Sequence, residues 1–224
     1  MRDEKHGIQM GKVFEGCDDG INNLSVDWDG SPVNYTCFSG HPLPVDPSIK
    51  SVEHCDNIAA NYYPQHHCMD EPIVYNTSLP TFGDHRPLWP VFGEYKFVPI
   101  QRWLHNIEHG AVIMLYHPCA NKIMVSRLRA LVTACIGKHI ITPYNQLAED
   151  RPLALITWGC RLTMNQVVID TVVDFIQKNS MKGPEGNYTK QGQYGQHLIK
   201  RSQLPLTGTI TNGTTKTTIC PNFH

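Results

Sequence analysis

Few charged residues and no long apolar run limit what this chain can be. Only 17% of its 224 residues are charged, the formal net charge is −1, and no long run of one sign occurs. Binding to nucleic acid or to an anionic membrane surface normally needs a basic patch, so neither partner is expected. Because no stretch of about 18 apolar residues is present, the sequence predicts no transmembrane helix.

Several motifs of well-known enzyme classes are also missing. The sequence contains no Gly-x-Ser-x-Gly nucleophile elbow, no phosphate-binding loop and no dinucleotide-binding fingerprint. It has no Cys-x-x-Cys pair either, which argues against a structural zinc knuckle. These absences leave enzymatic activity open and favour a non-catalytic protein.

Widely spaced cysteines and Asn-x-Ser/Thr sequons are what the sequence does contain. Together they are typical of disulfide-bonded glycoproteins from an oxidising, secretory compartment. Eight cysteines permit 105 pairings, and the sequence does not choose among them. The cysteines are Cys17, Cys37, Cys55, Cys68, Cys119, Cys135, Cys160 and Cys220, and the sequons lie at Asn23, Asn34, Asn76, Asn187 and Asn212.

The cellular location follows from these sites. Residues 1–11 are polar and lack the apolar core of a signal peptide. We therefore interpret the chain as a mature or truncated form of a secreted or lumenal protein that carries N-linked glycans. A cytosolic protein with accidental sequons is the alternative.

The composition divides the chain into three parts. Residues 1–60 are rich in Gly, Asp, Asn, Ser and Pro, which predicts a loop-like N-terminal extension held by disulfides. Residues 61–182 carry the regular apolar patterns of a core domain. Residues 183–224 are rich in Gly, Gln, Thr and Pro and predict an extended tail, tied down in part by Cys220.

Apolar periodicity predicts an α+β core, a small mixed sheet with helices packed on it. Asn121 is an expected N-cap, and Gly110 and Gly137 are expected helix stops. Cys135 falls on the apolar stripe of one helix, so a buried free thiol is an alternative to a disulfide there. The expected helices span residues 101–109, 121–136 and 165–178, and the expected strands span residues 111–116, 139–144 and 153–158.

The sharpest chemical feature is the run His105-Asn106-Ile107-Glu108-His109. On a helix, His105 and His109 would share one face and point two imidazoles at one metal ion. His85, in an upstream turn, is the expected third ligand. Copper or zinc suits such nitrogen ligands. The residues expected to support the ligands or their loops are His67, Asp84, Glu108 and His117.

Three other interpretations of these histidines remain. The run formally matches the zinc-peptidase pattern His-x-x-Glu-His, but Glu149 and Glu185, the acidic candidates downstream, lie in loops flanked by Pro or Gly. A hydrogen-bonded network with Asp84, Arg86 and Glu108 would need no metal. A pH switch is the third, because the 12 histidines change charge near neutral pH.

Two motifs together resemble a known family. They are Pro80-Thr81-Phe82-Gly83-Asp84-His85 and His105-Asn106-Ile107-Glu108-His109-Gly110, followed by Thr157-Trp158-Gly159 and Asp174-Phe175-Ile176. Roughly residues 75–200 are similar to the domain-of-unknown-function family 3105. Tyr116-His117-Pro118-Cys119, Trp158-Gly159-Cys160 and Lys182-Gly183-Pro184-Glu185-Gly186 are closest to its animal branch, which is like p53-inducible protein thirteen.

The resemblance implies an exported or lumenal domain but no established activity. It places His85, His105, Glu108 and His109 at the family's recurring polar positions. The animal relatives carry a membrane anchor, and whether this protein has one stays open.

Two hypotheses of function follow. The first is a secreted, N-glycosylated and disulfide-stabilised structural or interaction protein. Its partner would be a second copy or another extracellular protein, added as a strand to the extended terminal segments. The alternative is an extracellular metal-binding protein or metalloenzyme that holds copper or zinc through His85, His105 and His109.

Overall fold

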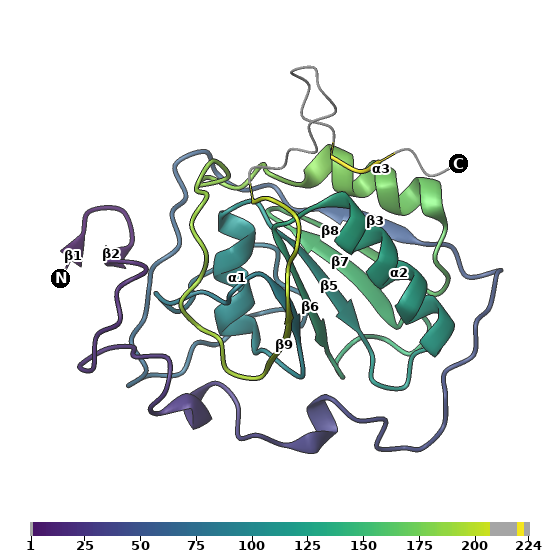
Figure 1. Cartoon of the computed structure of the whole chain (residues 1–224), viewed down its shortest axis with the longest axis horizontal. Coiled ribbons are helices and arrows are strands. Elements are labelled where there is room, and N and C mark those ends of the chain that lie inside the picture. The colour runs from purple at the N-terminus through teal and green to yellow at the C-terminus, as the bar shows by residue number, and fades with distance from the viewer. Residues whose placement is uncertain (1, 207–218, 222–224) are drawn as a thin grey trace.

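A seven-stranded mixed sheet forms the centre of the molecule. The computed structural model describes residues 2–206 and 219–221. The strand order is β3-β8-β7-β5-β6-β4-β9 (Figure 1). The strands are β3 (Val52–Cys55), β4 (Gly93–Tyr95), β5 (Val112–Tyr116), β6 (His139–Pro143), β7 (Leu153–Thr157), β8 (Cys160–Met164) and β9 (Leu198–Arg201).

Three helices accompany the sheet, and they confirm the predicted α+β class. They are α1 (Ile100–Glu108), α2 (Lys122–Cys135) and α3 (Ile169–Asn179). Strands β5 and β6 pair in parallel and are joined by α2, because parallel strands need a long crossover. Antiparallel pairs join β5, β7, β8 and β3. A separate hairpin is formed by β1 (Arg2–Asp3) and β2 (Gly7–Ile8), and the short helices are η1 (Leu24–Val26) and η2 (Pro32–Asn34).

The two faces of the sheet pack against different helices. Along β5, Val112 and Met114 join a core with α2 and α3, whereas Ile113 and Leu115 join a second core with α1. This follows from the alternation of side chains along a strand. Because both faces are covered, the central strands are continuous apolar runs. In the described part of the chain, α1 is the one α-helix that packs on the second face, and it carries the predicted histidine motif.

The predicted boundaries of two helices agree with the structure. The side chain of Asn121 accepts hydrogen bonds from the N–H groups of Ile123 and Met124, as an N-cap does. Gly110 follows α1 with a φ of 80°, the left-handed conformation of a helix C-terminus. Helix α3 begins later than predicted. Asn165 does not cap it, because its side chain bonds the backbone of Asp46 and Asp150.

Four strands of the seven-stranded sheet were not predicted, namely β3, β4, β8 and β9, and two of them come from the terminal segments. The N-terminal extension supplies β3, which pairs with β8 at one edge of the sheet. The tail supplies β9, which pairs with β4 at the other edge. Short edge strands bury little apolar surface and so leave a weak sequence pattern. The same applies to β4, which is three residues long.

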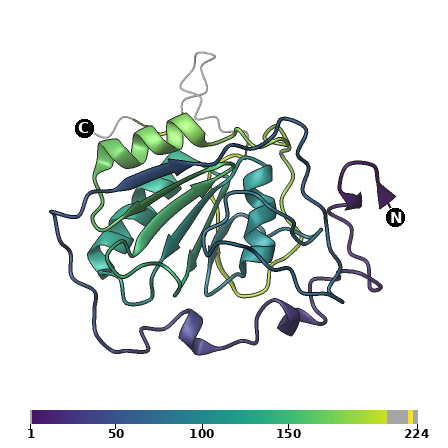
Figure 2. The ribbon, with the colours of Figure 1, turned by 180° about the vertical axis from the view of Figure 1, so that it is seen from behind.

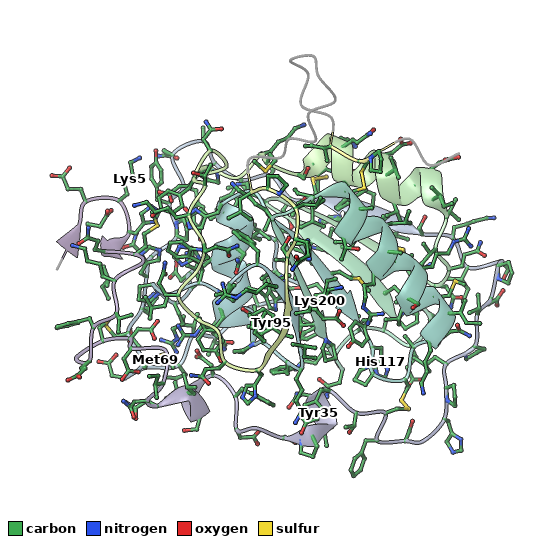
Figure 3. The ribbon with its side chains drawn as sticks, in the orientation of Figure 1. Lys5, Tyr35, Met69, Tyr95, His117 and Lys200 are labelled. Carbon is green, nitrogen blue, oxygen red and sulfur yellow. A yellow bond between two sulfur atoms is a disulfide. The ribbon has the colours of Figure 1, made fainter. Side chains whose placement is uncertain are left out.

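All eight cysteines form disulfides, which confirms the predicted disulfide bonding. The alternative of a free thiol at Cys135 is excluded, because the tail brings Cys220 against the end of α2. Three of the bridges fasten residues of the N-terminal extension, and their yellow sulfur bonds can be followed in Figure 3. The pairs are Cys17–Cys68, Cys37–Cys119, Cys55–Cys160 and Cys135–Cys220.

Two buried ion pairs also join the N-terminal extension to the core. Arg102 donates to both carboxylate oxygens of Asp18, at 2.5 and 2.9 Å. Arg86 pairs in the same way with Asp27. The extension runs around the outside of the molecule in Figure 2, where purple and blue mark it. It is thus attached to the core by charges as well as by disulfides.

Among the described helices, none has the length and apolar character needed to cross a membrane.

Candidate metal centre

Four buried side chains meet beside helix α1. His105 and Glu108 lie on the helix, one turn apart, while His66 and His85 come from loops that pair with each other through an isolated parallel β-bridge. Each residue can offer one ligand atom, and these atoms all lie within 4.8 Å of one another. We call His66, His85, His105 and Glu108 the primary cluster.

Backbone carbonyls orient the three imidazoles of the primary cluster. The Nδ1 atoms of His66, His85 and His105 contact carbonyl oxygens at 2.6, 2.9 and 2.7 Å. Because a carbonyl only accepts, each Nδ1 must carry a proton and donate it. In the described part of the chain, none of the three Nε2 atoms has a hydrogen-bond partner. Each of the three imidazoles thus keeps one buried nitrogen without a partner.

Glu108 faces these nitrogens with a buried carboxylate. Its Oε2 lies 3.2 Å from His85 Nε2, and its Oε1 lies 3.9 Å from Nδ1 of His6. Neither carboxylate oxygen has a hydrogen-bond partner among residues 2–206 and 219–221. A buried carboxylate without partners is costly, so a cation at this point would be strongly favoured. A bound metal ion would supply that charge.

Burial keeps the other two imidazoles of the primary cluster neutral. Desolvation, together with repulsion from the neighbouring His85, lowers the pKa of His66 to about 2. The same two causes hold the pKa of His105 well below its usual value. Neutral imidazole is the form that binds a metal ion, so these residues need not lose a proton at neutral pH to become ligands.

His109, the third predicted ligand, lies next to the primary cluster rather than within it. Its ring stacks on His105 at 4.8 Å and on Tyr188 at 4.9 Å. Its Nδ1 lies 3.4 Å from a carboxylate oxygen of Glu185. Burial lowers the pKa of His109 to about 3, although the negative Glu108 acts in the opposite direction.

His6 enters the same region from the N-terminal hairpin. Its ring stacks on His66 at 4.8 Å, its Nδ1 donates to the carbonyl of Pro64, and its Nε2 lies 3.6 Å from Glu185. Burial by itself would lower the pKa of His6. The nearby carboxylates of Glu185 and Glu108 outweigh burial and raise it to about 9.

Of the residues predicted to support the ligands, Glu108 belongs to the primary cluster itself, whereas His67, Asp84 and His117 lie outside it. The imidazole of His67 contacts Asp84 at 3.1 Å and Glu71 at 2.6 Å near the surface, and Asp84 also accepts from the backbone of Gln65. His117 accepts from the N–H of Cys119. In Figure 3 it lies on the side of the molecule opposite to Lys5, the neighbour of His6.

The hydrogen-bond network expected around the histidines is formed only in part. Three histidines do bond backbone carbonyls, and the carbonyl of Arg86 accepts from His105 Nδ1. The guanidinium of Arg86, however, donates to Asp27 and to the carbonyls of residues 67, 68 and 71. The side chains of Asp84, Arg86 and Glu108 are not bonded to one another.

Sequence reasoning missed His66 and His6. His66 has no fixed spacing to the histidines of α1. The adjacent His67 has the same side chain, so the sequence does not indicate which of the two is the ligand. His6 lies in a segment with no periodic pattern. The one available signal was the density of histidine and aromatic residues in Tyr62-Tyr63-Pro64-Gln65-His66-His67.

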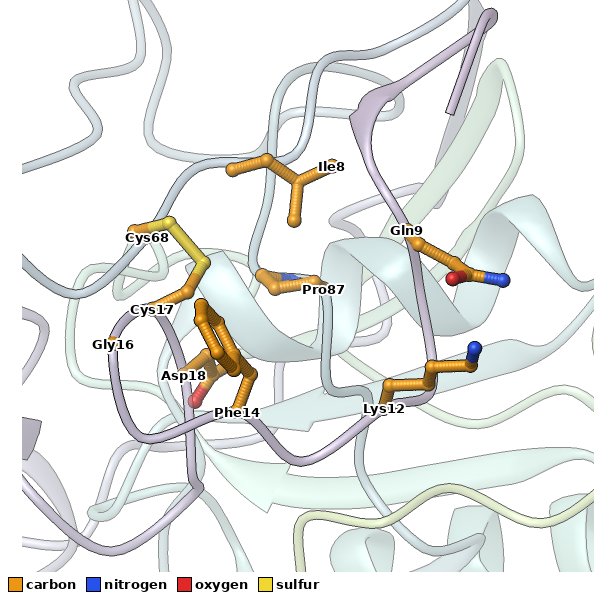
Figure 4. Close-up of a pocket in the computed structure, with 9 residues that line it drawn as sticks. All are labelled: Ile8, Gln9, Lys12, Phe14, Gly16, Cys17, Asp18, Cys68 and Pro87. Atoms are coloured by element: carbon orange, nitrogen blue, oxygen red, sulfur yellow. A yellow bond between two sulfur atoms is a disulfide. The ribbon is translucent and has the colours of Figure 1, made fainter. Parts of the chain in front are cut away.

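One hollow of the described structure is lined by no histidine. It holds about 120 Å³ beside the Cys17–Cys68 disulfide, and Ile8, Phe14 and Pro87 line part of it (Figure 4). No residue of the primary cluster lines it. Because it gathers few polar groups, the primary cluster is the better candidate for chemistry.

The comparisons with known proteins agree with the predicted family. The model of a family described as "Protein of unknown function (DUF3105)" matches residues 66–192, which contain the whole primary cluster. Tumor protein p53-inducible protein 13 of the rat, Rattus norvegicus, is 38% identical over 77 residues. That match covers 34% of this chain and only 20% of the rat protein. No solved structure matches.

Proposed function

The chain belongs to the family of proteins of unknown function DUF3105, and from the chemistry of its buried cluster we propose that it binds a transition-metal ion. The ligands would be His66, His85, His105 and Glu108, and the ion would be zinc or copper. One observation carries this proposal. Three imidazoles, each held by a backbone carbonyl at Nδ1, and one buried carboxylate place four ligand atoms within 4.8 Å of one another.

The donor set favours zinc or copper over the harder cations. Calcium and magnesium are held mainly by oxygen atoms, whereas imidazole nitrogen suits zinc and copper. Bonds of about 2.1 Å in a tetrahedral site place neighbouring ligand atoms about 3.4 Å apart. The distance of 3.2 Å between His85 Nε2 and Glu108 Oε2 is close to that value.

The carbonyls around the cluster would hold the ligands in place. Metal-bound histidines commonly donate their second ring N–H to a carbonyl or carboxylate, which fixes the tautomer and the ring. Here the accepting carbonyls belong to Ile8, Gly83 and Arg86. Metal binding would therefore stabilise the N-terminal hairpin together with the loops that precede α1.

The four disulfides of the chain fit a secreted or extracellular protein, because disulfides persist in oxidising compartments. We propose N-linked glycans on Asn23, Asn76 and Asn187, which are exposed. Asn34 is half-buried and its side chain bonds Trp28 and Asn145, so it is a poorer acceptor. The predicted site at Asn212 lies outside the described residues.

Self-association is a second candidate function, supported by the edge strand β3. All four of its residues are exposed, and β3 pairs on one side with β8. A free strand edge is a template for adding a strand from a second copy. Sedimentation of the purified protein tests this idea: a monomer at high concentration would exclude it.

Metal analysis tests the main proposal. Protein secreted from cultured cells and purified without chelator is expected to contain at least one zinc or copper ion per chain. His105→Ala should lose that ion. His139→Ala is a matched control, since His139 is also buried with its Nδ1 on a carbonyl, but lies on β6. Substoichiometric metal that His105→Ala leaves unchanged would contradict the proposal.

A further inference from the structure

A second group of metal-binding side chains lies beside the primary cluster. The carboxylate of Glu185 lies between two imidazoles, with Oε1 at 3.6 Å from His6 Nε2 and Oε2 at 3.4 Å from His109 Nδ1. His6 and His109 are 4% and 1% exposed. These three residues come from the N-terminal hairpin, the end of α1 and the start of the tail.

Several of their polar atoms are buried without partners. Among the described residues, His6 Nε2, both ring nitrogens of His109 and Glu185 Oε2 lack a hydrogen bond. The primary cluster does not account for them, because its four ligand atoms belong to other residues. Buried polar groups normally find partners, so an arrangement of this kind indicates a ligand.

We propose that His6, His109 and Glu185 hold a second transition-metal ion, of the same class as the first. This inference rests on the proposed function, because the second ion would sit beside the first. Both imidazoles are nitrogen donors and the carboxylate balances charge, so zinc is the natural probe.

Glu108 and Glu185 contact different atoms of His6. Oε1 of Glu108 lies 3.9 Å from His6 Nδ1, which donates to the carbonyl of Pro64. Nε2 of His6 is therefore the nitrogen left to bind the second ion, and it faces Glu185. Glu108 thus belongs to the first site, where its Oε2 lies 3.2 Å from His85 Nε2, and Glu185 supplies the carboxylate of the second.

The second position would be the more accessible one. A hollow of about 370 Å³ opens beside it and is lined in part by His6, Glu185, Tyr62 and Trp158. The side chain of Glu185 is 24% exposed, whereas that of Glu108 is 1% exposed. The second ion should therefore exchange with solvent faster than the first and be removed first by a chelator.

Zinc stoichiometry tests this proposal. Chelator-treated full-length protein is reloaded with zinc, passed over a desalting column and analysed for metal. The wild type is expected to retain two ions per chain, and Glu185→Gln one. Glu149→Gln, at an exposed loop position, is the control and should retain two. His6→Gln provides a second variant that should also retain one, should Glu185→Gln fail to fold.

The outcomes separate this inference from the proposed function. One ion in the wild type and in both variants overturns the second site, makes His6 and Glu185 a simple ion pair, and leaves the metal-binding function standing. Two ions in both variants overturn the assignment of these residues. No ion in the wild type overturns both proposals.

Discussion

His85 Nε2 lies 3.2 Å from Glu108 Oε2, and both side chains are almost completely removed from water. Within the described residues the carboxylate has no hydrogen-bond donor to offset this burial. A protein optimised only for stability would not keep such a group, because removing a charge from water costs several kcal/mol. Strongly destabilised groups of this kind are typical of functional sites. The contact therefore favours the proposed metal site over a structural hydrogen-bond network.

Glu108→Gln tests that distinction directly, because it removes the charge and keeps the shape. The variant is expected to bind zinc at least about tenfold more weakly, and its metal-free form should be as stable as the metal-free wild type, or more stable. Calorimetric titration and thermal unfolding measure the two quantities. A fall of several degrees in the melting temperature of the metal-free variant would instead support a structural network.

The stability of the metal-free protein should depend on pH below neutrality. The pKa values of His66 and His109 are lowered by burial to about 2 and about 3, from about 6.5 in the unfolded chain. Between pH 6.5 and 5 only the unfolded state takes up these protons. The free energy of unfolding should then fall by up to about 1.4 kcal/mol per pH unit for each histidine.

His6 should act in the opposite direction at alkaline pH. Its pKa is raised to about 9 in the folded state, so its contribution is present below pH 6.5 and is lost as the pH rises through 9. Urea unfolding of chelator-treated protein from pH 5 to 10 measures both effects. A flat profile between pH 6.5 and 5 would show that the imidazoles are not held neutral.

The ion pair between Asp18 and Arg102 should be essential for the attachment of the N-terminal extension. Asp18→Ala leaves a buried guanidinium without its carboxylate, which should destabilise the protein by about 3–5 kcal/mol. Asp29→Ala, at an exposed position, is the control and should cost less than about 1 kcal/mol. Denaturant unfolding compares the variants. Equal stability of the two variants would mean that the Asp18–Arg102 ion pair contributes little to this attachment.

Glycan occupancy should follow the exposure of each sequon in the structure. Asn76→Gln and Asn187→Gln should each remove one glycan from protein secreted by animal cells, seen as a mass loss that enzymatic deglycosylation abolishes. Asn34→Gln should cause a smaller loss, because the Asn34 amide donates to Asn145. Equal masses for all three variants and the wild type would contradict the secretory assignment.

Local patterns were enough to predict the three helices and the strands β5, β6 and β7. Asn121 and Gly110 set helix ends through contacts within a few residues. The continuous apolar run of residues 111–116 is short and ends before Pro118, a pattern that favours a buried strand. The edge strands β3 and β9 were not predictable in this way. Strand β3 forms where the disulfide to Cys160 holds Cys55 at the sheet, and β9 forms where the tail pairs with the distant strand β4. The disulfide pairing could not be predicted either, because it joins cysteines that are far apart along the chain.

The sequence by itself determined the α+β class, the disulfide-bonded character and the placement of His105 and Glu108 on one helix, because these depend on periodicity and composition. Only the tertiary structure decided that His66 joins His85 at that helix, and that His6 and Glu185 lie beside them. These residues are far apart along the chain. Their meeting depends on how loops are anchored by carbonyls, ion pairs and disulfides, and no spacing rule encodes it.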